Sequence, residues 1–65
     1  MIKIKFIGEN DDDFTKDKIY QLVSISEDNY YFYAYITNNE NKISVIPYSS
    51  LFNFNMNWEV VNNER

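Results

Sequence analysis

The chain has 65 residues, a net charge of −4 from ten acidic and six basic side chains, and neither cysteine nor histidine. This length predicts one domain, residues 1–65, near the lower size limit for a single hydrophobic core. A small domain is often stabilised by disulfides, a metal or a partner subunit. Without cysteine or histidine, disulfides and a usual zinc site are excluded, so self-association is the remaining support. The lysines are spread along the chain and the only arginine is Arg65, so no basic stripe for nucleic acid is expected.

The N-terminal segment predicts a half-buried strand. Residues 2–7, IKIKFI, alternate between apolar side chains and lysines. The same lysines interrupt any signal-like apolar segment, and no part of the chain approaches the ~20 apolar residues of a membrane span. We therefore expect a soluble, cytoplasmic protein without membrane contact.

The next segment, residues 9–17, reads as a polar loop in which Phe14 points inward. Its acids do not match an EF-hand, because counting from Asp11 puts Lys16 and Leu22 where that motif needs glycine and glutamate. An irregular cation site or a mimic of a nucleic-acid backbone would also use such acids, but a solvated loop is the ordinary interpretation. Without histidine, cysteine or an enclosed carboxylate pair, we expect no enzymatic activity, no metal and no cofactor.

Residues 18–26, KIYQLVSIS, fit either a helix or a strand. Ile19, Leu22 and Val23 have helical spacing, but the segment is rich in residues that favour strands, and the chain has one alanine and two leucines. We predict a strand with a bulge that moves burial from Tyr20 and Leu22 to Ile25.

Residues 29–37, NYYFYAYIT, hold five aromatic rings in a strand pattern, and residues 38–41, NNEN, predict a tight hairpin loop. Placing Thr37 opposite Lys42 fixes the pairing by counting. The predicted pairs are Ile36–Ile43, Ala34–Val45 and Phe32–Pro47 on the inner face, and Tyr35–Ser44, Tyr33–Ile46 and Tyr31–Tyr48 on the outer face. Pro47 must then lie at a strand end or a sheet edge, since it has no N–H to donate.

The C-terminal segment predicts a short helical turn at YSSLF, residues 48–52, followed by a last strand. Apolar and polar residues alternate strictly from residue 52 to 60. The side chains expected to point inward are Phe52, Phe54, Met56, Trp58 and Val60.

Two segments carry a resemblance to a known group. TKDKIYQLVSI, residues 15–25, and PYSSLFNFNMNWEVV, residues 47–61, resemble small, mostly uncharacterised SH3-like proteins of low-G+C Gram-positive bacteria and their phages. The resemblance implies an all-β fold, a small five-stranded SH3-like barrel with one short helical turn before the last strand. Two departures stand out, since Asp17 replaces a turn glycine and the segment before Val60 is longer than usual.

One predicted surface is a candidate binding site. The outer face of the predicted hairpin would carry Tyr31, Tyr33, Tyr35, Ile46 and Tyr48. Tyrosine is enriched at binding hot spots, and contiguous exposed apolar patches mark contacts. Two intramolecular alternatives are cross-strand packing that stiffens the sheet and burial of the patch beneath the acidic loop through Phe14.

The leading hypothesis is a non-enzymatic binding module that contacts a protein partner, or a second copy of itself, through this face. An alternative is an inhibitor from a phage or mobile element that blocks a host or defence factor. A third is a small-molecule sponge whose aromatic rings stack on a base or sugar at a subunit interface.

Overall fold

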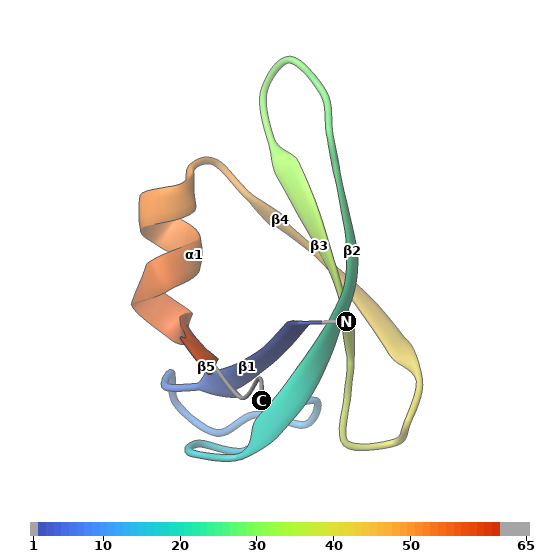
Figure 1. Cartoon of the computed structure of the whole chain (residues 1–65), viewed down its shortest axis with the longest axis vertical. Coiled ribbons are helices and arrows are strands. Elements are labelled where there is room, and N and C mark those ends of the chain that lie inside the picture. Colours follow the sequence, from blue (N-terminus) through green and yellow to red (C-terminus); the bar gives the residue numbers. More distant parts are fainter. Residues whose placement is uncertain (1, 62–65) are drawn as a thin grey trace.

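The computed structural model describes residues 2–61, which form one antiparallel sheet and one helix (Figure 1). The strands are β1 (Ile2–Phe6), β2 (Ile19–Glu27), β3 (Phe32–Thr37), β4 (Ile43–Tyr48) and β5 (Trp58–Val61), and α1 (Leu51–Asn57) precedes β5. The sheet order β4-β3-β2-β1-β5 makes β4 and β5 its edges. The prediction of five strands and a helical segment before the last one is confirmed. The sheet is not closed, so barrel closure is not observed.

The predicted bulge in β2 is confirmed. Leu22 lies opposite Ile36, but Ser24 lies opposite Tyr35, so the register shifts between them. Beyond the bulge, Ile25 returns to the core side opposite Ala34, but it is 54% exposed, so the prediction that burial moves from Tyr20 and Leu22 to Ile25 is wrong. The reason is visible in Figure 1, where the β2–β3 hairpin extends beyond the rest of the sheet and beyond α1.

The predicted pairing of β3 with β4 is wrong by one residue. The turn includes Lys42, because the Asn38 N–H donates to the Lys42 carbonyl at 2.8 Å and Asn41 adopts a left-handed φ of 64°. Thr37 therefore faces Ile43, and Phe32 faces Tyr48. A one-residue shift moves every side chain of a strand to the other face.

Pro47 occupies an edge position, as predicted. The hydrogen bond from Asn38 to Lys42 sets the alternation of the β3–β4 ladder, and Pro47 falls opposite Tyr33 at a non-hydrogen-bonded pair. Its nitrogen therefore faces the open edge of β4, where the missing N–H breaks no bond within the sheet.

The prediction that residues 52–57 belong to a strand is wrong, because α1 spans Leu51–Asn57. Ser50 caps the helix, its hydroxyl accepting from the Asn53 N–H at 3.1 Å. Since each helical residue turns the side chain by about 100°, Phe52 and Met56 point away from the buried Phe54 and are 74% and 62% exposed. Val60, also predicted to point inward, is exposed as well. The helix is too short to cross a membrane, and no other helix occurs in residues 2–61.

Asp17 takes the backbone conformation that a turn glycine would take. Its φ is 71°, in the left-handed region that aspartate tolerates better than most residues. Its N–H donates to the Phe6 carbonyl at 2.7 Å, and the Lys18 N–H donates to the Thr15 carbonyl at 3.1 Å. The first bond, together with the bond from the Phe6 N–H to the Lys18 carbonyl at 3.0 Å, fastens the end of the β1–β2 loop to β1, and the second closes the turn within the loop.

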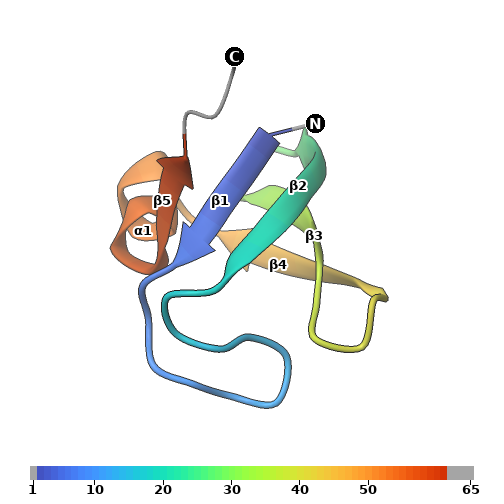
Figure 2. The ribbon, with the colours of Figure 1, turned by 60° about the horizontal axis from the view of Figure 1, so that its bottom comes forward.

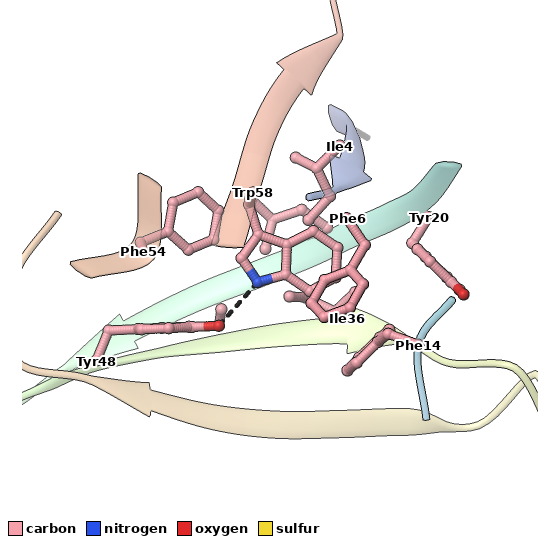
Figure 3. Packing of buried hydrophobic residues seen from close by; sticks show 10 residues of the cluster. Ile4, Phe6, Phe14, Tyr20, Ile36, Tyr48, Phe54 and Trp58 are labelled. Carbon is pink, nitrogen blue, oxygen red and sulfur yellow. Dashed lines mark hydrogen bonds between the residues drawn. The ribbon is translucent and has the colours of Figure 1, made fainter. Parts of the chain in front are cut away.

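The core lies on one side of the sheet and is built around Trp58 (Figure 3). The indole is 1% exposed and packs against the rings of Phe6, Phe14 and Phe54, with centroids 4.9, 5.0 and 6.4 Å away. Its Nε1–H donates to the Tyr48 hydroxyl at 2.8 Å, so the one polar atom of the ring is satisfied inside the core.

Two phenylalanines of α1 test this arrangement. Replacing the buried Phe54 with alanine removes contacts with Trp58 and Tyr48, and we expect it to lower the free energy of unfolding by about 3–5 kcal/mol. Phe52→Ala removes an exposed ring, and its effect should stay within about 0.5 kcal/mol. Urea denaturation of both variants measures the difference; equal losses would mean that residue 52 faces the core.

Candidate functional site

The outer face of β3 and β4 carries a row of apolar side chains. Tyr33 lies opposite Pro47 and Tyr35 opposite Val45, on the side of the sheet away from the core. Tyr31, which directly precedes β3 and is 48% exposed, adds a ring whose centroid is 6.4 Å from that of Tyr33. We call this surface the tyrosine face: Tyr31, Tyr33, Tyr35, Ile43, Val45 and Pro47.

Two residues predicted for this surface lie elsewhere. Because of the shifted register, Ile46 is opposite Ala34 and packs against the core, and Tyr48 is 8% exposed within it. The prediction that Ile46 and Tyr48 share a face with the tyrosines of β3 is therefore wrong. The missed residues are Ile43, Val45 and Pro47, which alternate with the inward-facing ones.

The acidic loop does not cover the tyrosine face. Phe14, the anchor of that loop, packs edge-on against Trp58 and Tyr20 in the core, with centroids 5.0 Å away in both cases. The loop therefore lies on the core side of the sheet, and the burial of the tyrosines beneath Phe14 that we considered does not occur.

Hydrogen bonds to β2 and to the following turn hold two of the rings. The Tyr33 hydroxyl donates to Asp28 Oδ2 at 2.8 Å, and the Tyr35 hydroxyl lies 3.3 Å from Ser26 Oγ. Tyr35 is paired with Ser24, so its bond runs diagonally to the next outward residue of β2. The small serines leave room for the rings beside them, and the bonds limit the orientations that the rings can take.

Asp28 links the β2–β3 turn to the tyrosine face. Its Oδ1 accepts from the N–H groups of Tyr30 and Tyr31 at 2.8 and 2.9 Å, and its own N–H donates to the Tyr31 carbonyl at 2.9 Å. These backbone bonds, and then the bond from Tyr33, lower the pKa of Asp28 below its ordinary value of 3.8. In return, the bond to Asp28 raises the pKa of Tyr33 above 10.0.

The tyrosine face offers ring area, aliphatic side chains and hydroxyl groups. Within residues 2–61 no three acidic side chains, histidines or cysteines come close enough to hold a metal ion. The sequence of β4 alone does not show which of its residues face outward, because that depends on the length of the β3–β4 loop. The side chain of Asn38, which accepts from the N–H groups of Glu40 and Lys42 at 2.9 and 3.1 Å, is the local signal for the longer turn.

Comparison of the chain with protein-family models, curated proteins and solved structures found no match. The functional argument therefore rests on the geometry of the surfaces.

The bond between Asp28 and Tyr33 predicts a pH dependence. Since the pKa of Asp28 is lowered on folding, its stabilising contribution is present above pH 3.8 and is lost as pH falls through the lower, folded-state pKa. We expect carbon-13 NMR to show Asp28 titrating below 3.8 and Tyr33 titrating above 10.0. Tyr33→Phe should raise the pKa of Asp28 only in part, because the two backbone bonds remain. An Asp28 pKa at or above 3.8 in the native protein would contradict the described geometry.

Proposed function

We propose that this chain is a small, non-enzymatic binding module whose tyrosine face contacts a protein. The observation that carries the proposal is the contiguous set of three tyrosines, two aliphatic residues and a proline on the outer side of β3 and β4. Helix α1 and the acidic loop both pack on the opposite side, so no element of residues 2–61 covers this set.

The arrangement of the rings favours tight contact. Tyr33 and Tyr35 are half-buried and are bonded through their hydroxyls to Asp28 and Ser26. Rings that are already oriented lose little conformational freedom when a partner binds, which is one reason why tyrosines serve as hot spots. An apolar patch of this kind on a small domain is a common mark of a protein contact.

The composition of the face indicates the kind of partner surface. Its six residues are uncharged, and the neighbouring Asp28 is engaged by three hydrogen bonds from Tyr30, Tyr31 and Tyr33. A neutral face suits an apolar or uncharged protein surface rather than a phosphate backbone. A second copy of the chain offers such a surface, and so does an unrelated protein.

A charge placed at the centre of the face tests the proposal. We expect Tyr33→Lys to weaken association at least tenfold, because a lysine there would have to be desolvated at the contact. Met56→Lys makes the same charge change on the exposed side of α1 and should leave association unchanged. Sedimentation velocity over a range of concentrations measures self-association, and circular dichroism confirms that both variants fold.

If the native protein is a monomer, the same pair of variants identifies a foreign partner. That partner should be retained from a lysate by the native protein and by Met56→Lys, but not by Tyr33→Lys. Unfolding of Tyr33→Lys would place the ring in the core and overturn the proposal. Equal binding by all three proteins would overturn it as well.

A further inference from the structure

The two edges of the sheet differ in how they are protected against a further strand. β5 has four residues and carries the charged Glu59; it lies beside α1 (Figure 2), and its Trp58 N–H is already bonded to the Phe54 carbonyl of that helix. β4 has six residues, carries no charged side chain and pairs with β3 without a bulge. Edge strands of natural proteins are usually protected by charges, bulges or proline, and of these β4 has Pro47 alone.

Ile43 and Val45 direct backbone groups to the open edge of β4. The bond from the Asn38 N–H to the Lys42 carbonyl sets the β3–β4 ladder, so every second residue from Ile43 onward turns its N–H and carbonyl away from β3. Within residues 2–61 the N–H groups of Ile43 and Val45 have no hydrogen-bond acceptor. Pro47, the next such position, offers a carbonyl without an N–H.

A second copy of β4 matches these groups in one antiparallel register. When Ile43 of each copy lies opposite Val45 of the other, both residues form hydrogen-bonded pairs, and every open N–H finds a carbonyl. Placing Val45 opposite itself sets Pro47 against Ile43, whose carbonyl then has no donor. Placing Ile43 opposite itself sets Val45 against Asn41, whose N–H is already bonded to the Asn38 carbonyl at 2.9 Å.

Charged side chains complement each other in the same register. The pairing has two-fold symmetry and sets Ser44 opposite Ser44. Asp13 lies there, its Oδ2 accepting from the Ser44 hydroxyl at 3.4 Å, because the β1–β2 loop curves toward the β3–β4 turn (Figure 2). Lys42 of the second copy is the diagonal neighbour of Ser44, so each Asp13 meets a lysine. The ion pair of Lys42 with Glu40, at 3.9 Å, is exposed, so little is lost when the lysine turns to Asp13.

Apolar side chains meet on the other side of the sheet. There Ile43 of each copy lies beside Val45 of the other, and these side chains are 53% and 50% exposed in the single chain. Apolar cross-strand pairs of this kind stabilise a sheet. Both residues belong to the tyrosine face, so the pairing joins the two tyrosine faces into one continuous apolar surface.

We propose that two copies of this chain pair antiparallel along their β4 edges, with Ile43 of each copy opposite Val45 of the other, so that the two sheets become one. This contact goes beyond the proposed function, because it uses the backbone of β4 and leaves Tyr33 and Tyr35 available for a further protein surface.

Hydrogen exchange of the native protein tests the pairing without any substitution. Measured amide by amide by NMR, exchange at Ile43 and Val45 should be at least tenfold slower in a concentrated sample than in a dilute one, because pairing protects both N–H groups. The control is the Val60 N–H. The bond from the Ile7 N–H to the Asn57 carbonyl sets the β1–β5 ladder, so Val60 turns its N–H to the open side of β5. Equal slowing at Val60, or none at Ile43 and Val45, overturns the proposal.

A proline at position 45 tests the same contact. Val45→Pro removes an open N–H from each copy without breaking a bond to β3, as Pro47 already does, and should weaken self-association at least tenfold. Val45→Thr keeps the N–H and the branched side chain, and its self-association should stay within about twofold of the native value. Sedimentation velocity measures both variants, and circular dichroism checks their folding. If Val45→Pro does not fold, hydrogen exchange of the native protein decides.

The same substitutions in the Tyr33→Lys background separate the two proposals. Val45→Pro should still abolish the association that remains when the tyrosine face is blocked. Weakening by Tyr33→Lys but not by Val45→Pro overturns the β4 pairing and leaves the tyrosine face as the contact. The reverse result supports the pairing and counts against self-contact through the tyrosine face. A native protein that stays monomeric overturns the pairing, and loss of a lysate partner from Val45→Pro would then assign the edge to a foreign strand.

Discussion

The packing around Trp58 is the interaction on which the small core depends. Its indole meets rings from β1, from the β1–β2 loop and from α1, and its Nε1–H reaches the Tyr48 hydroxyl at the end of β4. One side chain thus joins four segments in a chain without a cysteine. Because these segments all pack on one side of the sheet, the tyrosine face on the other side stays uncovered, and the acidic loop is held over the core.

Most of the fold was predictable from the alternation of apolar and polar residues. The predictions that failed did so for physical reasons. β1 and β3 each have one clearly apolar face, so their orientation could be read directly. In α1 the apolar residues alternate with asparagine, which fits a strand equally well. Two interactions favour the helix over a strand: the N-cap at Ser50 and the packing of Phe54 against Trp58. The cap is local in sequence, whereas the packing of Phe54 depends on the whole fold.

The candidate surfaces were predictable only where they rest on a single strand. Tyr33 and Tyr35 were identified because the alternation of β3 places them outward by itself. The β4 residues opposite them could not be, since one extra residue in the turn exchanges Val45 for Ile46. The packing around Trp58 was harder to predict, because its neighbours Phe6, Phe14 and Phe54 come from segments distant in sequence that meet only in the folded chain.

The pairing of β1 with β5 has a consequence for the order of folding. Ile4 lies opposite Val60, so these strands come from opposite ends of the described chain, whereas β2, β3 and β4 are joined by short turns. Closing a long loop costs more chain entropy than closing a hairpin, and contacts distant in sequence form slowly. The tyrosine face belongs entirely to the fast, local part of the structure. The core side, with Trp58 on β5, depends on this long-range pairing, so we expect it to be completed after the tyrosine face.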